Sequence, residues 1–170
     1  MTQSIKKFSN LFAIMLLTSF LAACATAPTE TSSSSTSSTS QSEVVGGIYI
    51  GTDTVEMLAI DVPDRVFFAY DSYSLAASAQ ATLNKQAKWL KANPSVAIAV
   101  EGHADERGTR EYNLALGDRR ASSVKDYLMS QGISSNRIST ISYGKERPVK
   151  SGSNDTAWAQ NRRSVSVRTN

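Results

Sequence analysis

The sequence is poor in the residues on which most metal and redox sites depend. Its 170 residues include one cysteine, Cys24, and one histidine, His103. A single cysteine excludes a disulfide within the chain, and a lone histidine without a second cysteine gives a zinc site little support. No stretch resembles the nucleophile turn of a serine hydrolase. We therefore expect no metal, no cofactor and no catalytic nucleophile, and we predict that the protein is not an enzyme.

An excess of positive charge is also nearly absent. The formal net charge is +3, and removal of Lys6 and Lys7, which lie in a segment that we expect to be cleaved, leaves +1. Basic residues form no dense stripe interleaved with aromatic residues, the pattern typical of nucleic-acid-binding surfaces. The sequence therefore predicts no nucleic-acid partner.

Residues 1–23 have the features of a targeting segment. Lys6 and Lys7 form a positive start, and the apolar stretch Leu11–Phe20 is too short to span about 30 Å of hydrocarbon as a permanent helix. We predict that residues 1–23 are a signal peptide.

The end of this segment reads Leu-Ala-Ala-Cys and resembles the bacterial lipoprotein cleavage box. The resemblance implies cleavage before Cys24 and acylation of Cys24; the alternative is an unmodified, buried cysteine. Several acyl chains on one residue would give stable membrane anchoring. Ala25 follows the cysteine where an aspartate would resemble an inner-membrane retention signal, which favours the outer membrane, with the domain facing the periplasm.

Two segments precede the main domain. Residues 24–43 are rich in serine and threonine, which predicts a flexible tether after the lipidated cysteine, although a spacer under no constraint is the alternative. Residues 44–62 contain short strand-like patterns around Ile48–Ile50 and Val55–Val62, and we expect them to pack on the edge of the domain.

Residues 63–170 alternate strand and helix patterns. The expected strands are Arg65–Tyr70, Val96–Val100, Arg137–Tyr143 and Arg163–Thr169; the expected helices are Ser74–Asn93, about Arg110 to Gln131, and a short turn at Asp155–Asn161. This order predicts an α+β fold, a β-α-β-α-β-β sandwich in which two main helices pack on one face of a mixed sheet.

The stretch EGHADERGTREYNLALGDRRASSV, Glu101–Val124, carries the candidate site. Thr109 is the expected N-cap of the second helix and Gly132 its expected C′ residue. Asn113, Gly117 and Arg120 fall on one stripe of that helix. Gly117 costs on the order of 1 kcal/mol in mid-helix, which close approach of a backbone or a ligand would explain. We expect Asp105 and Arg120 to form opposite poles of a pocket for a small zwitterion.

From about Val62 to the end, the sequence resembles the OmpA-like peptidoglycan-binding domains. The stretches EGHADERGTREYNLALGDRRA, SYGKERP and WAQNRRSV resemble in particular the peptidoglycan-associated lipoproteins of the Tol–Pal system, which act in envelope integrity and cell division. The resemblance implies an outer-membrane lipoprotein that binds the diaminopimelate of peptidoglycan stem peptides without covalent attachment.

The resemblance also implies roles for individual residues. Asp105 and Arg120 would hold the ammonium and the carboxylate of diaminopimelate, with Asn113 and Asp71 as further ligand contacts. Ala69 stands where family members often have aspartate, so that contact is missing here.

A second implied site lies in the turn after the strand. Glu106, Arg107 and Gly108 would bind a TolB-type periplasmic β-propeller, although an ordinary polar turn is the alternative. Arg162 and Arg163 match the family's closing pair, and we expect one of them to brace the sheet or the pocket wall.

Simpler interpretations stay open beside these. Asp105 could pair with Arg107 or Arg110 on the surface, and Arg120 could be a solvated charge. The chain could serve another envelope machine as an accessory lipoprotein, and a cell-wall hydrolase is a further, less supported alternative.

Overall fold

A computed structural model describes residues 44–45, 48–49 and 57–170. These residues belong to one unit of the chain, Ser38–Asn170. The predicted signal peptide, Cys24 and the predicted tether lie outside the described residues.

A mixed four-stranded sheet forms the centre of the fold. Its strands are β5 (Arg65–Phe67), β6 (Ile98–His103), β7 (Ile138–Gly144) and β8 (Arg163–Arg168), in the order β5-β8-β6-β7. β6 and β7 are parallel, whereas β8 runs antiparallel to both β5 and β6. The predicted α+β fold with a mixed sheet is confirmed.

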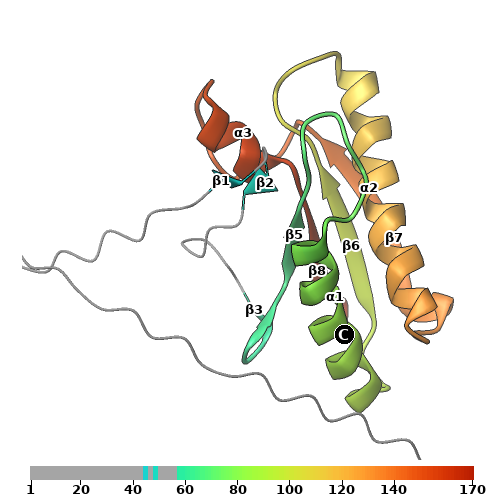
Figure 1. The fold of residues 1–170 in the computed structure, drawn as a ribbon. Helices are drawn as coiled ribbons and strands as arrows, with labels where there is room; N and C mark the ends of the chain where they lie inside the picture. The colour runs from blue at the N-terminus through green and yellow to red at the C-terminus, as the bar shows by residue number, and fades with distance from the viewer. Residues whose placement is uncertain (1–43, 46–47, 50–56) are drawn as a thin grey trace, which may run out of the picture. The chain divides into compact units, whose positions relative to one another are not determined.

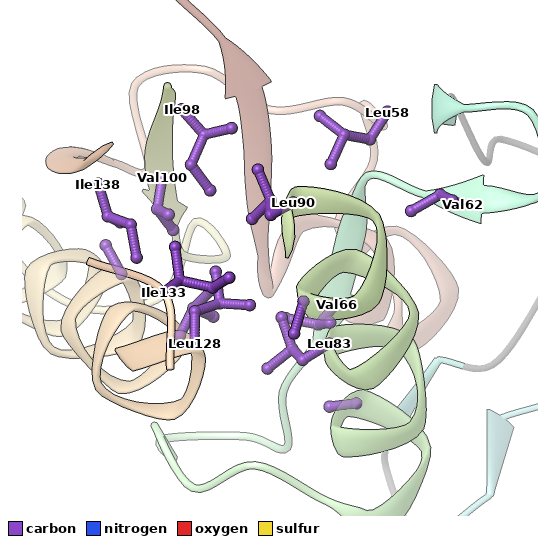
Figure 2. Packing of buried hydrophobic residues seen from close by; sticks show 14 of the residues in the cluster. Leu58, Val62, Val66, Leu83, Leu90, Ile98, Val100, Leu128, Ile133 and Ile138 are labelled. Atoms are coloured by element: carbon purple, nitrogen blue, oxygen red, sulfur yellow. The ribbon is translucent and has the colours of Figure 1, made fainter. Parts of the chain in front are cut away.

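The two main helices, α1 (Ala77–Ala92) and α2 (Arg110–Ser130), pack on the same face of this sheet (Figure 1). Between helices and sheet lies the apolar core, in which Figure 2 shows Leu83 and Leu90 of α1 beside Leu128 of α2 and Val100 of β6. A 3₁₀ turn, η1 (Ser135–Arg137), follows α2, and a short helix, α3 (Asp155–Asn161), precedes β8. None of the helices in the described part of the chain combines the length and the apolar character of a membrane span.

Four short strands precede β5. β1 (Val44–Val45) pairs with β2 (Ile48–Tyr49), and β3 (Met57–Ala59) pairs with β4 (Val62–Pro63), both antiparallel. The described part of the strand expected over Val55–Val62, from Met57 onward, belongs to a small hairpin, because Asp61 adopts a left-handed φ of 60° and turns the chain.

The predicted boundaries differ from the structure mainly where strands meet loops. The first strand ends at Phe67 rather than Tyr70, since Ala69 and Ser72 turn their carbonyls toward Arg120. The second strand continues to His103, because its pairing with β7 extends that far. Both predicted ends of α2 are confirmed: the Thr109 side chain accepts a hydrogen bond from the Tyr112 amide, and Gly132 has a φ of 89°.

At Gly117, α2 lies close against the backbone of the sheet. A Cβ atom on Gly117 would overlap Ser142 Oγ of β7 and lie 2.9 Å from the carbonyl oxygen of Gly102 in β6. The Ser142 hydroxyl cannot easily give way, since it donates to the Leu114 carbonyl at 2.7 Å. Close packing of backbone therefore explains the mid-helix glycine.

Replacing Gly117 with alanine should destabilise the protein, although helix propensity alone favours alanine by about 1 kcal/mol. Overpacking of this kind costs about 1–3 kcal/mol, so the net change should be a loss, measured by urea unfolding. Asp118→Ala, on the exposed side of the same helix turn, is the control and should change stability by no more than about 0.5 kcal/mol. A Gly117→Ala protein more stable than the wild type would contradict this packing explanation.

Candidate functional site

The loop between β6 and α2 forms one wall of a small cavity. Asp105 lies in this loop, two residues after the end of β6, and its Oδ1 accepts a hydrogen bond from the Arg107 amide at 3.1 Å. Gly108 completes the turn with a φ of 92°, a left-handed conformation that suits glycine. The turn returns the chain to Thr109, where α2 begins.

The cavity has a volume of about 180 Å³ and opens to solvent. It is lined by Tyr70, Asp71, Asp105, Arg107, Gly108, Tyr112, Asn113, Leu116 and Arg120. The four residues predicted to contact a ligand, Asp105, Arg120, Asn113 and Asp71, thus lie around one cavity. Their role as ligand contacts stays a prediction.

Arg120 is fully buried and holds three backbone carbonyls. Its Nε and Nη1 donate to Ser72 and His103 at 2.8 Å each, and Nη2 donates to Ala69 at 3.2 Å. The interpretation as a solvated charge is therefore wrong. Nη1 and Nη2 each carry a second N–H beyond these bonds.

Burial, followed by the nearby charge of Arg162, lowers the pKa of Arg120 to about 10, whereas the charge of Asp105 opposes the shift. The guanidinium is still protonated at neutral pH. Arg120 therefore supplies the cavity with a fixed positive charge that the backbone holds in place.

Asp105 is also buried, with 5% of its surface exposed, and it is paired with two arginines. Arg107 forms a two-point contact, from Nη2 to Oδ2 at 2.6 Å and from Nε to Oδ1 at 3.1 Å. Arg162 Nη1 donates to Oδ2 at 3.3 Å. The alternative pairing with Arg107 is therefore present, but it lies inside the site and not on the surface.

Burial alone would raise the pKa of Asp105, yet the hydrogen bonds from Arg107, assisted by Arg162, hold it below its usual value of 3.8. The carboxylate is therefore ionised at neutral pH, as an ammonium-binding group needs to be.

Arg107 lies between two aromatic rings. Its guanidinium carbon is 4.1 Å from the ring centroid of Tyr70 and 4.1 Å from that of Trp158. Stacking of this kind on both faces adds to the ion pair with Asp105.

The turn Glu106–Gly108 is held from outside by two side chains. The indole Nε1 of Trp158 donates to Glu106 Oε1 at 3.0 Å. Lys145 donates to the carbonyls of Glu106 and Gly108 at 3.2 and 2.7 Å. The turn predicted to bind a protein partner therefore has a fixed shape.

Asn113 and Asp71 both line the cavity. Asn113 is buried and uses its Nδ2 to hold the carbonyls of Arg107 and Thr109, at 2.8 and 3.1 Å. Asp71 has a left-handed φ of 51° and accepts a hydrogen bond from the Tyr112 hydroxyl, which raises the pKa of Tyr112. The side chain of Ala69 does not line the cavity; its backbone carbonyl contributes through Arg120.

The two closing arginines, Arg162 and Arg163, have different partners. Arg162 braces the cavity wall through Asp105 and through the Phe68 carbonyl, to which Nε donates at 3.0 Å. Arg163 instead holds the carbonyl of Arg147 at 3.3 Å.

Sequence reasoning left open which arginine braces the wall. It also missed Tyr70, Tyr112 and Leu116 as cavity residues, because only the folded chain brings them to the cavity.

The side chain of His103 does not line the cavity, although its backbone carbonyl holds Arg120. It is 2% exposed and packs against Tyr143, with ring centroids 5.5 Å apart. Burial, followed by the charges of Arg163 and Arg147, lowers its pKa to about 3, so the imidazole is neutral. Among the residues that the structure describes, no three histidine, cysteine or acidic side chains are grouped so that they could hold a metal ion.

The sequence from β5 to the end of α3 matches the model of the OmpA family over residues 67–162. The chain belongs to the OmpA family. Over 108 residues it is 58% identical to the peptidoglycan-associated lipoprotein of Brucella melitensis, a match that covers 64% of either chain. The matched region spans just under two thirds of that protein's length.

Solved structures also resemble the fold. The peptidoglycan-associated lipoprotein of Burkholderia pseudomallei is 43% identical, with a TM-score of 0.61, over 62% of this chain and 90% of that chain. The cell wall anchor of the type VI secretion system from Pseudomonas aeruginosa is 27% identical, with a TM-score of 0.52, over 68% and 86% of the two chains.

Replacing Asp105 with asparagine should make the unfolding free energy less dependent on pH in the acidic range. A carboxylate whose folded pKa lies below its unfolded value stabilises the fold above that value, and the stabilisation is lost as pH falls through the folded pKa. The difference in unfolding free energy between wild type and Asp105→Asn, measured by urea titration, should be constant above about pH 5 and shrink below pH 3.8. A difference that grows on acidification would contradict the pairing described here.

Proposed function

We propose that this OmpA-family domain binds peptidoglycan through the diaminopimelate of the stem peptide. The observation that carries the proposal is that Asp105 and Arg120, of opposite charge, line one cavity of about 180 Å³. Diaminopimelate presents an ammonium and a carboxylate on one carbon, so a single amino-acid centre can contact both groups. The names of the relatives, peptidoglycan-associated lipoproteins, are in keeping with this ligand.

In the proposed complex, the Asp105 carboxylate accepts hydrogen bonds from the ammonium. The second N–H groups on Nη1 and Nη2 of Arg120 donate in parallel to the ligand carboxylate, an arrangement that suits a planar guanidinium. Asn113 holds the loop and offers its amide oxygen, and Asp71 contacts the ligand from the rim. Each charge-assisted bond contributes about 1.5–3 kcal/mol, which gives modest affinity per site once the cost of association is subtracted.

The residues that precede the domain are suited to a tethering role in this proposal. Cleavage before Cys24 and acylation of that residue would anchor the protein in the outer membrane, facing the periplasm, and residues 24–43 would span the distance to the wall. Many low-affinity sites held near one polymer give high avidity. The protein would thereby link the outer membrane to peptidoglycan as part of a Tol–Pal system, in envelope integrity and cell division.

The same loop supports an exchange between two partners. Gly108 and Arg107 line the cavity, and Glu106 is exposed beside it. A TolB-type β-propeller bound at these three residues would cover the cavity mouth. Binding of the propeller and of peptidoglycan would therefore exclude each other.

A role in another envelope machine is the second candidate. The structural similarity to a type VI secretion cell wall anchor favours it. Such a role would use the same cavity and the same wall ligand, but a different protein partner. A metal-dependent hydrolase would need a cluster of metal ligands, and among the described residues no three histidine, cysteine or acidic side chains are grouped in that way.

Replacing Arg120 with lysine should weaken retention on peptidoglycan by roughly tenfold or more, because an ammonium cannot reproduce the parallel bonds of the guanidinium. The measurement is co-sedimentation of the full-length chain, held in mild detergent, with diaminopimelate-type peptidoglycan. Arg119→Lys is the matched control and should bind like the wild type, since Arg119 lies on the exposed side of α2. Equal retention by Arg120→Lys, with folding intact, would count against capture of the ligand carboxylate by Arg120.

Reversing the charge of Glu106 should separate the two proposed partners. Glu106→Lys should reduce capture of a TolB-type propeller about tenfold, because the reversed charge would no longer complement a propeller surface that pairs with Glu106. Peptidoglycan retention should change much less, since Glu106 does not line the cavity. A pull-down from solubilised envelopes measures capture, with Asp118→Lys as the control. Recovery of a different envelope machine by the wild type would favour the second candidate.

A further inference from the structure

The carboxylate of Asp105 has no free acceptor position in the cavity as it stands. Oδ1 accepts from the amide and from Nε of Arg107, both at 3.1 Å. Oδ2 accepts from Nη2 of Arg107 at 2.6 Å and from Nη1 of Arg162 at 3.3 Å. A carboxylate offers about four lone-pair sites, and these four bonds use them. An arriving ammonium can therefore bind Asp105 only if one of the present donors leaves.

The two arginines differ in how firmly they are held. The Arg162 side chain is 6% exposed and is also fixed by the Phe68 carbonyl. The Arg107 side chain is 32% exposed and lines the cavity that the ligand would enter. Arg107 also supplies two of the side-chain bonds to Asp105, so that its departure frees one position on each oxygen. Arg107 is therefore the donor that can leave.

We infer that the Arg107 guanidinium is a displaceable internal counterion that occupies the place of the ligand ammonium on Asp105, and that binding exchanges one cation for the other. This inference rests on the proposed function and adds a specificity-determining residue to it. Leaving a buried carboxylate unpaired is strongly unfavourable. Exchange of cations avoids that cost, because Asp105 stays neutralised both before and after the ligand binds.

The aromatic rings give the exchange its selectivity. Tyr70 and Trp158 hold the guanidinium on both faces at 4.1 Å, so a weak competitor cannot displace it. A ligand with only carboxylates has nothing to offer Asp105 and leaves Arg107 in place. A zwitterion can replace Arg107 with its ammonium while Arg120 binds its carboxylate. The internal counterion thus selects for ligands that carry both charges on one carbon.

The decisive experiment compares meso-diaminopimelate with pimelate, the same dicarboxylic acid without amino groups. Binding to the full-length chain in mild detergent is measured by isothermal titration calorimetry for wild type and for Arg107→Met. The variant should bind meso-diaminopimelate roughly tenfold more tightly, the equivalent of about 1.4 kcal/mol of competition removed, and should gain no affinity for pimelate. Arg110→Met, which removes the same charge from a residue that does not line the cavity, should show neither change.

A second variant tests the inference without touching the ion pair. Trp158→Leu removes one ring of the stack from outside the cavity and should tighten binding of meso-diaminopimelate in the same direction, by a smaller factor. Equal or weaker binding by both variants, with wild-type binding intact, would overturn the counterion inference and leave the proposed function standing. Absence of binding by wild type and variants alike would overturn the proposed function, and the inference with it.

Discussion

A buried carboxylate must be neutralised, and the site is built around that requirement. Asp105 is 5% exposed, and two guanidinium groups neutralise it. Arg107 belongs to the same loop, whereas Arg162 lies 57 residues further along the chain. Burial strengthens these contacts and makes a missing partner costly. The positions of the loop after β6 and of the turn before β8 therefore depend on each other through one side chain.

A second buried charge organises the opposite wall. The guanidinium of Arg120 holds carbonyls from the β5–α1 connection and from the end of β6. Its main partners are backbone groups and not an acid. The cavity thus contains one charge fixed by side chains and one fixed by backbone, and only the first has partners that can be exchanged.

Much of this architecture is predictable from the sequence, because it depends on local patterns. The helical spacing of apolar residues such as Leu83, Leu90 and Leu128 predicts helices α1 and α2 and the faces that they bury. The capping residues Thr109 and Gly132 predict the ends of α2. The shared location of Asp105 and Arg120 is also predictable, since a short loop joins the strand to the helix.

The pairing within the site is not predictable in the same way. Arg162 reaches Asp105 from 57 residues away, and Trp158 reaches Glu106 from 52 residues away. The spacing of apolar and polar residues in the sequence does not indicate such contacts, because they depend on how α3 and β8 pack against the loop. Gly117 shows the same limit: its position on the stripe is visible in the sequence, but only the structure shows that Gly102 and Ser142 need the space.

Because Arg120 contacts segments that are distant in the sequence, the cavity forms only when the whole unit is folded. Its carbonyl partners at Ala69 and Ser72 lie about fifty positions away along the chain, so these walls exist together only when the unit is fully assembled. A molecule that occupies the cavity binds the native state alone and shifts the unfolding equilibrium by mass action. If the cavity binds cell-wall fragments as proposed, these fragments would raise the thermal stability of the folded chain, and protein detached from the wall would be the form more open to proteolysis.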